Sequence, residues 1–345
     1  MEYRTLGNSG CSVSNLALGT MTFGKETDET ASHAQLDMFL EAGGTLVDTA
    51  DVYTGGNSEQ IVGRWLADRP ADVAGRVVLA TKGRFPSGTG GPNGVGLSRR
   101  HLSIALDNSL RRLGIETIDL YQLHAFDALT PVEETFRFLD DAVSAGKIRY
   151  VGLSNFLAYQ IQKIVDVTGY RGWSVPVTLQ PQYSLLVRGI EDEIVPACAA
   201  NGIGLLPWSP LGGGWLTGKY QRDSAPSGNT RLGEDPDRGM EAYAGRNAKQ
   251  RTWDVIDAVQ KVAEDRSVSM AQVALAWVTD RPTVTSTILG ARTTEQLQDN
   301  LGAGDLHLSE SEIAALDQAS DPEVPDYPYG VAGTGQRNRD IDAGA

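Results

Sequence analysis

Residues 45–48, 76–82 and 117–124 have the sequences TLVD, RVVLATK and TIDLYQLH, and they predict three consecutive β-strands. Each run is short and rich in leucine or β-branched residues. Each is followed by a loop and then by a segment with apolar residues at helical spacing. Alternation of this kind is typical of a parallel sheet with helices packed on the outside.

The same alternation continues along the rest of the chain. The segments predicted as strands are 16–20, 44–50, 76–81, 117–124, 148–155, 177–182, 203–209 and 283–290. The segments predicted as helices are 28–41, 58–69, 98–114, 131–146, 157–169, 190–202 and 293–302. We count eight strand–helix units, although the seventh strand is followed by a long insertion and not by a predicted helix. In a chain of 345 residues they favour a closed (β/α)₈ barrel, a TIM barrel of the α/β class. An open doubly wound sheet is the structural alternative, and the absence of a G-x-G-x-x-G pattern weakens it.

Four stretches depart from the alternation. Residues 3–16 precede the first strand and predict a hairpin, and residues 83–97 form a glycine-rich loop after the third strand. Residues 211–250 are too many for a structureless loop, which predicts a functional insertion at the mouth of the barrel. Residues 1–320 are therefore expected to form one domain. The remaining residues, 321–345, are rich in proline, glycine and aspartate and are expected to be an extended or partly disordered arm.

Composition excludes several classes of partner. The net charge is −14, whereas nucleic-acid binding needs clustered lysine and arginine and anionic membranes attract basic segments. No apolar run approaches the roughly 20 residues of a membrane span, and the start MEYRTLGNSG lacks the features of a secretory signal. Cys11 and Cys198 are too few for a disulfide framework or a metal site. We therefore expect a cytoplasmic protein without a structural metal.

Four polar residues follow the first predicted strands closely: Asp48, Tyr53, Lys82 and His124. Any one of them alone is better explained as a cap, an anchor or a solvated side chain, but parallel strands would bring all four to the same end of the sheet. Carbonyl reduction needs a hydride on carbon and a proton on oxygen. Tyrosine is a weak acid near neutrality, and a nearby lysine lowers its pKa while an aspartate holds the lysine in place. A neutral histidine can orient the carbonyl oxygen, so the four residues predict general acid–base catalysis by a reductase.

The chain also resembles the aldo-keto reductase family, in particular its longer bacterial-type members, over residues 3–302. The resemblance is carried by GGTLVDTADVYTGGNSEQIVG (43–63), LATKG (79–83), DLYQLH (119–124), KIRYVGLSNF (147–156), PWSPLGGGWLTGKY (207–220) and LGARTTEQLQDNLGA (289–303). It implies a (β/α)₈ barrel, no metal, and a nicotinamide cofactor, usually NADPH, extended over the C-terminal face. Asp48, Tyr53, Lys82 and His124 match the catalytic residues of the family.

Further positions match the cofactor site of the family. Ser154, Asn155 and Gln180 match the residues that hold the nicotinamide carboxamide, and Trp208 stands where the family usually has a tyrosine stacked on the ring. A glycine-rich turn suits a pyrophosphate, and the matching residues are Ser209, Leu211, Gly212, Gly214 and Lys219. The segment GGWLTGK nearly completes a P-loop, but Tyr220 replaces the metal-binding hydroxyl, which argues against a nucleotide hydrolase.

The adenosine end of the cofactor is expected near the last motif. Gln296, Asp299 and Asn300 can share one helical face beside Gly290, and Arg292 can pair with a 2′-phosphate, which favours NADPH over NADH. Thr20 and Met21 match a segment near the cofactor. Besides Tyr53 and Trp208, the aromatic residues expected to line an apolar substrate pocket are Phe23, Phe85 and Trp215. Residues 327–330, YPYG, resemble a C-terminal segment of the longer members, although the residues that follow are less aromatic here.

These observations predict an NADPH-dependent reductase of aldehyde or ketone carbonyls, with Tyr53 as the general acid and a small-molecule carbonyl as its partner. A keto-sugar or sugar-nucleotide reductase of secondary metabolism is an alternative within the same family. A regulatory, cofactor-binding module with vestigial activity, like the channel-associated β subunits that the family contains, is an alternative from another class.

Overall fold

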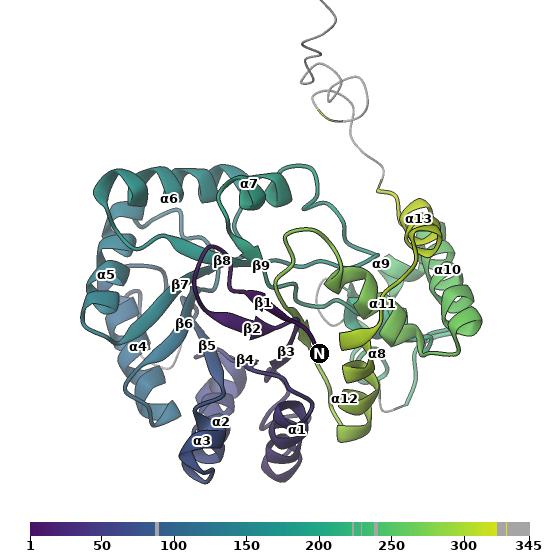
Figure 1. Ribbon diagram of the computed structural model, residues 1–345, viewed down its shortest axis with the longest axis horizontal. Helices are drawn as coiled ribbons and strands as arrows, with labels where there is room; N and C mark the ends of the chain where they lie inside the picture. The colour runs from purple at the N-terminus through teal and green to yellow at the C-terminus, as the bar shows by residue number, and fades with distance from the viewer. Residues whose placement is uncertain (87–89, 223, 229, 238–240, 323–328, 330–345) are drawn as a thin grey trace, which may run out of the picture.

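The computed structural model describes residues 1–345 except 87–89, 223, 229, 238–240, 323–328 and 330–345. Eight parallel strands form one curled sheet in the order β10-β3-β4-β5-β6-β7-β8-β9. Their bounds are β3 Leu16–Gly19, β4 Leu46–Asp48, β5 Val78–Gly83, β6 Ile118–Leu123, β7 Ile148–Ser154, β8 Pro176–Gln180, β9 Gly204–Leu205 and β10 Thr287–Leu289. Figure 1 shows the curled sheet with helices around its outside.

The two ends of the strand order are joined by backbone hydrogen bonds next to β9 and β10. The amide of Leu205 donates to the carbonyl of Thr283 at 2.8 Å, and the amide of Thr285 donates back to Leu205 at 2.9 Å. Further along, the amide of Ile288 donates to the carbonyl of Pro207 at 3.0 Å. These bonds close the sheet, and the predicted (β/α)₈ barrel is confirmed.

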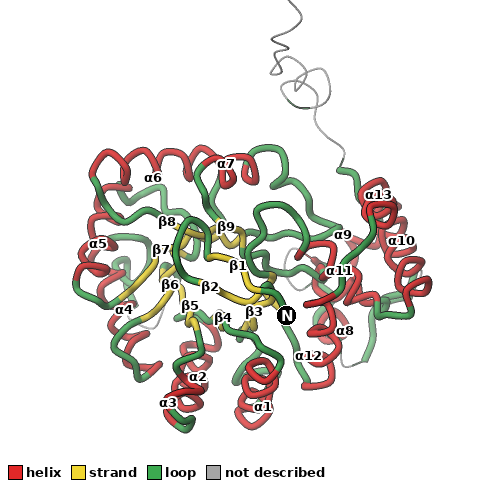
Figure 2. The backbone as a smooth tube through the Cα atoms, viewed as in Figure 1, coloured by secondary structure: helices red, strands yellow, loops and turns green. Residues whose placement is uncertain are grey.

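Figure 2 shows the helices encircling the strands. Their bounds are α1 Glu29–Glu41, α2 Asn57–Ala67, α3 Ala71–Ala74, α4 Arg99–Leu113, α5 Val132–Ser144, α6 Ala158–Arg171, α7 Ile194–Ala200, α8 Arg231–Glu234, α9 Tyr243–Asn247, α10 Gln250–Arg266, α11 Met270–Thr279, α12 Thr294–Leu301 and α13 Glu310–Ala319. Short 3₁₀ segments are η1 Tyr53–Gly56, η2 Gly212–Thr217 and η4 Gly302–Asp305. Within the described residues, no helix has both the length and the apolar character needed to cross a bilayer.

The sequence analysis assigned no element to α10, α11 or α13. Helix α11 is the instructive case, because eight of its residues are buried and its apolar run therefore has no polar face to mark a period. Its start did carry a local signal, since Ser269 and Gln272 form a capping box. The predicted insertion 211–250 accordingly contains η2, α8 and α9, and the chain then runs directly into α10. Most of the predicted arm 321–345, including most of 327–330, lies outside the described residues.

The protein has two hydrophobic clusters, one inside the barrel and one between the strands and the surrounding helices. The inner cluster contains Leu46, Ala80 and Leu120 from neighbouring strands. The predicted N-terminal hairpin, β1 Tyr3–Thr5 and β2 Ser12–Ser14, is confirmed, and Leu6 and Val13 from it complete this cluster. In Figure 1 the hairpin, drawn in purple, lies across the strands. It therefore covers the N-terminal end of the barrel and leaves the C-terminal end for a site.

A layer of polar side chains lies next to this apolar layer, on the same inward face of the strands and two residues closer to their C-terminal ends. Asp48, Lys82 and Gln122 each follow a member of the inner cluster by two positions, and successive side chains in a strand point to opposite faces. Lys82 and Gln122 are also directly paired in the sheet register. The C-terminal half of the barrel interior is therefore polar.

The loop between β4 and η1 contains a buried carboxyl group, that of Asp51. Its amide donates to the carbonyl of Lys82 at 3.1 Å, its side chain is 1% exposed, and neither carboxyl oxygen has a hydrogen-bond partner among the described residues. Nearby, Glu59 accepts from Thr81 and from Arg112, both at 2.6 Å. Burial, and then the charge of Glu59, raise the pKa of Asp51 from 3.8 to about 7, although Arg112 and Lys82 lower it in part.

This raised pKa predicts a pH-dependent stability that Asp51→Asn removes. The folded protein retains a proton that the unfolded chain loses, so the free energy of unfolding falls as pH rises from about 4 to about 7 and then levels off. At about 1.4 kcal/mol per pKa unit, Asp51 accounts for at most about 4 kcal/mol of that fall. Urea unfolding from about pH 5 to about pH 8 should show a smaller loss of stability in Asp51→Asn than in the parent.

The exposed Asp72 at the start of α3 provides the matched control. Asp72→Asn should leave the pH dependence of the urea midpoint unchanged. Parallel curves for Asp51→Asn and the parent protein would show that Asp51 is not protonated in the folded state near neutral pH.

Candidate active site

A cavity of about 570 Å³ lies where the C-terminal ends of the strands meet. Asp48, Tyr53 and His124 line it, and so do Lys219, Arg231 and Arg292. Of the residues predicted to hold the cofactor, those that line it are Met21, Ser154, Asn155, Gln180, Trp208, Ser209, Leu211, Gly214, Lys219, Gly290, Arg292, Gln296, Asp299 and Asn300. Segments far apart in the sequence, from Gly19 to Asn300, therefore meet around one cavity.

Lys82 is the centre of the polar network at the barrel end of this cavity. Its ammonium group is fully buried and donates to Oδ2 of Asp48 at 2.5 Å, to the carbonyl of Thr49 at 2.9 Å and to the hydroxyl of Tyr53 at 3.2 Å. Oδ1 of Asp48 accepts from the side-chain amides of Gln122 at 3.0 Å and Gln180 at 2.9 Å. Both charges are thus held by hydrogen bonds, as a buried ion pair requires.

The pKa values of this group keep the lysine charged and the phenol neutral. Burial lowers the pKa of Lys82, but the charge of Asp48 and the hydrogen bonds to Asp48 and Tyr53 outweigh it, and the net pKa lies above the ordinary value. Burial raises the pKa of Tyr53, and the nearby Lys82 only partly offsets that rise. The expected lowering of the pKa of Tyr53 is therefore not found, because desolvation of the phenolate exceeds the attraction of the lysine. Tyr53 keeps its proton at neutral pH.

His124 directly follows β6 and lies beside the phenol. Its ring centroid is 5.9 Å from that of Tyr53 and 4.8 Å from that of Phe85. Burial, and then the charges of Lys82 and Arg84, lower the pKa of His124 to about 3. The imidazole is consequently neutral throughout the physiological pH range, as the sequence analysis expected.

The residues expected at the carboxamide form a connected set. Asn155 donates to the carbonyl of His124 and to Oγ of Ser154, both at 3.0 Å, and it accepts from the indole of Trp208 at 3.1 Å. Ser154 donates to the carbonyl of Gln180 at 2.9 Å. Trp208 is thereby fixed at the wall of the cavity, with its indole ring half-buried.

The glycine-rich turn after β9 has a backbone conformation that favours glycine. Gly213 and Gly214 have φ of 68° and 95°, and a Cβ at Gly214 would lie 2.3 Å from Cε of Lys219. Oγ of Ser209 donates to Glu241 at 2.5 Å and accepts from the amide of Gly213 at 3.2 Å. The amides of Gly212 and Gly214 donate to the carbonyls of Ser209 and Leu211, so all three glycine amides bond within the turn.

Three cations, Lys219, Arg231 and Arg292, line this cavity. Burial, and then the charges of Arg292 and Arg231, lower the pKa of Lys219. Arg292 is paired with Glu234 through two hydrogen bonds of 2.9 and 3.0 Å. The sequence analysis missed Arg231, which lies in the insertion without any motif around it. It also missed Gln122, although a polar residue two positions after Leu120 in an apolar strand was a signal.

The polar residues of α12 that line the cavity form hydrogen bonds with neighbouring residues of the protein. Oε1 of Gln296 accepts from the amide of Arg292 at 2.9 Å, and Asn300 donates to the carbonyl of Gly290 at 3.5 Å. Asp299 accepts from Ser269 at 2.8 Å and from Gln272 at 3.1 Å. These contacts join α12 to α11 and to the end of β10.

Six predicted site residues are not in the wall of the cavity, and one of them is Lys82, which is bonded to Asp48 and Tyr53 in that wall. Thr20 is fully buried and bonded to Ser58 at 2.8 Å, and Gly212 is buried, whereas Gly213 and Gly214 line the cavity. Phe23 belongs to the hydrophobic core, and Trp215 is fully buried against Tyr220, Tyr243 and Trp253. Phe85 contacts His124 without lining the cavity. Aromatic residues in loops were predicted as pocket walls, whereas burial of their large apolar area draws two of them into the core.

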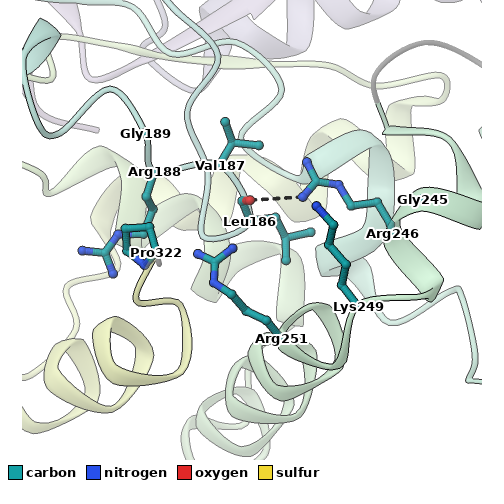
Figure 3. A pocket seen from close by; sticks show the side chains of 9 residues that line it. All are labelled: Leu186, Val187, Arg188, Gly189, Gly245, Arg246, Lys249, Arg251 and Pro322. Atoms are coloured by element: carbon teal, nitrogen blue, oxygen red, sulfur yellow. Dashed lines mark hydrogen bonds between the residues drawn. The ribbon is translucent and has the colours of Figure 1, made fainter. Parts of the chain in front are cut away.

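A second, more open depression of about 430 Å³ lies between the loop after β8 and the start of α10. Four cations line it, namely Arg188, Arg246, Lys249 and Arg251. Figure 3 shows Arg246 reaching the carbonyl oxygen of Leu186, and Arg188 is bonded to Glu191. Arg251 donates to the carbonyls of Ser320 and Asp321, so these guanidinium groups tie neighbouring segments together.

Comparison with known proteins identifies the family. The family model described as the aldo/keto reductase family matches residues 15–321. Versiconal hemiacetal acetate reductase of Aspergillus parasiticus is 34% identical and is matched over 94% of this chain and 98% of its own. L-glyceraldehyde 3-phosphate reductase of Escherichia coli (strain K12) is 33% identical, over 92% of each chain. A probable voltage-gated potassium channel subunit beta of Oryza sativa subsp. japonica is 36% identical, over 89% of this chain and 92% of its own. With matches of this extent, the chain belongs to the aldo/keto reductase family and is an oxidoreductase.

Proposed function

We propose that this chain is an NADPH-dependent reductase of aldehyde or ketone carbonyls in which Tyr53 is the general acid. The observation that carries the proposal is one cavity that is lined by both a proton donor and three cations. The donor is the phenol of Tyr53, held 3.2 Å from Lys82, and the cations are Lys219, Arg231 and Arg292.

The residues of the cavity fit an extended dinucleotide phosphate. Ser154 and Asn155 would hold the carboxamide, and Trp208 offers an aromatic face to the nicotinamide ring. The glycine-rich turn with Lys219 would hold the pyrophosphate. Arg292 and Arg231 would hold the 2′-phosphate, for which a guanidinium fork is well shaped. When bound, the reduced nicotinamide supplies the hydride for the reaction.

The proton is supplied by the chain itself. Tyr53 is neutral at physiological pH and donates its phenolic proton to the carbonyl oxygen as the oxygen gains negative charge. Lys82 then stabilises the phenolate that remains, and Asp48 keeps the lysine in place. His124, which is neutral, orients the carbonyl oxygen by hydrogen bonding. Water restores the proton of Tyr53 after the product has left.

The substrate is proposed only at the level of an aldehyde or ketone, with a keto-sugar or sugar nucleotide as the alternative. One relative carries the name of a reductase of a phosphorylated aldehyde and another that of a channel β subunit. The second name keeps a regulatory role as a candidate. Oxidation of NADPH with a panel of aliphatic, aromatic and sugar carbonyls separates these functions, because a vestigial site would show no turnover with any of them. We also propose that the protein acts in the cytoplasm, on the basis of its few cysteines.

Replacement of Tyr53 tests the assignment of the acid. Tyr53→Phe should lower kcat by roughly 10²- to 10⁴-fold, because the hydroxyl that donates the proton is lost while the ring remains. The dissociation constant for NADPH should stay within about threefold of the parent value, since the phenol is no part of the proposed cofactor contacts. Steady-state NADPH oxidation and fluorescence titration measure the two quantities. Tyr170→Phe, at an exposed position on α6, is the control, and turnover equal to the parent in Tyr53→Phe would exclude Tyr53 as the acid.

Replacement of Arg292 tests the proposed cofactor. Arg292→Gln should weaken NADPH binding by roughly ten- to hundredfold, because charge-assisted hydrogen bonds to the 2′-phosphate are lost. NADH lacks this phosphate, and its dissociation constant should change by less than about threefold. Arg149→Gln, at an exposed position in β7, is the matched control. An equal loss of affinity for both cofactors would place Arg292 elsewhere than at the 2′-phosphate.

A further inference from the structure

Glu234 forms an ion pair with Arg292, whose guanidinium group is proposed to bind the cofactor. Its two carboxylate oxygens accept from Nη1 and Nη2 of Arg292 at 2.9 and 3.0 Å. The two residues are 58 positions apart, one in α8 of the insertion and the other directly after β10. A second carboxylate, that of Glu26, lies 3.9 Å from Nη2 and is too far for a comparable bond.

A carboxylate and a phosphate use the same two donors of an arginine. Both anions pair with the guanidinium fork through parallel N–H bonds, so they compete when the fork is held on one side. Arg292 lines the cavity, and its side chain is 18% exposed. Glu234 therefore stands at the position of an anionic group of the ligand.

The surroundings of Arg292 still favour an added anion. Lys219 and Arg231 line the same cavity. Burial, and then the charges of Arg292 and Arg231, lower the pKa of Lys219. Glu234 supplies one negative charge to this group of three cations, whereas a phosphate monoester supplies nearly two. A phosphate can thus displace Glu234, but at the cost of the existing ion pair.

The short helix that carries Glu234 is anchored in place. Leu232 is fully buried, and its amide donates to the hydroxyl of Tyr220 at 3.3 Å. Thr230 caps the same turn through the amide of Gly233 at 3.0 Å. The side chain of Glu234 is 42% exposed, so solvent reaches the carboxylate that pairs with Arg292.

From this geometry we propose that Glu234 is a specificity-determining residue that competes with the cofactor 2′-phosphate for Arg292 and thereby weakens the preference for NADPH over NADH. The proposal rests on the function proposed above. Glu234 lies in the insertion, outside the six motifs that match the family. Its negative charge opposes the positive charge of Arg292. Because both carboxylate oxygens of Glu234 accept from the donors of Arg292 proposed for the 2′-phosphate, the expected effect of Glu234 is on cofactor binding.

Equilibrium binding to the full-length protein tests this proposal without turnover. NADPH, NADH and adenosine 2′,5′-bisphosphate are titrated against the parent protein and Glu234→Gln, with intrinsic tryptophan fluorescence or calorimetry as the readout. Glu234→Gln should tighten binding of NADPH and of the bisphosphate by roughly three- to fivefold, as expected for one partly exposed ion pair. NADH should change by less than about twofold, and the gain for NADPH should shrink at high salt.

Two control variants isolate the pair. Glu310→Gln replaces a glutamate at the start of α13, which is not a partner of Arg292, and it should bind all three ligands as the parent does. In an Arg292→Gln background, Glu234→Gln should no longer change NADPH affinity, because the guanidinium group for which Glu234 and the phosphate compete is absent.

Each alternative role of Glu234 gives a different result. Weaker NADPH binding by Glu234→Gln would show that Glu234 orients Arg292 for the phosphate, and equal tightening of NADPH and NADH would show that it closes the insertion over any cofactor. Either result, or no change at all, overturns the proposal while the proposed reductase stands. Failure of the parent protein to bind either dinucleotide overturns the proposed function and this inference together.

Discussion

The structure of the barrel mouth depends on the ion pair between Lys82 and Asp48. Moving a lysine and an aspartate out of water is costly, and their attraction offsets the cost only when the remaining donors and acceptors are also satisfied. Here the ammonium group has the carbonyl of Thr49 and the phenol of Tyr53 besides its 2.5 Å contact with Asp48. The carboxylate has the amides of Gln122 and Gln180. Strands β4, β5, β6 and β8 must all be in register for this network to form.

The two-residue period of the strands explains how a charged network can lie next to an apolar core inside one barrel. Leu46, Ala80 and Leu120 fill the barrel, and the residues two positions later are Asp48, Lys82 and Gln122. A shift of one residue in any strand would exchange this inward face for the outward one. Stability is thus concentrated at the N-terminal end, where the hairpin covers the core, and chemistry at the C-terminal end, as is general for this fold.

Electrostatics inside the cavity differ from those of the whole chain. The protein has a net charge of −14, yet Lys219, Arg231 and Arg292 line the same cavity. The insertion between β9 and α10 supplies both signs, because Arg231 adds to the cations while Glu234 and Glu241 bond to Arg292 and Ser209. The insertion is therefore part of the cavity wall and contributes to its charge.

The sequence alone determined the eight strands, most of the helices, the barrel and the meeting of Asp48, Tyr53, Lys82 and His124 at one end. These follow from local patterns, because alternation and helical spacing are set by neighbours in the chain. Only the tertiary structure decided which of these groups are buried and what each one bonds to. Desolvation raises the pKa of Tyr53 instead of lowering it, Phe23 and Trp215 pack in the core, and Arg292 is held by a glutamate 58 residues away. Burial and pairing between distant segments depend on the closed barrel as a whole, and no local period in the sequence records them.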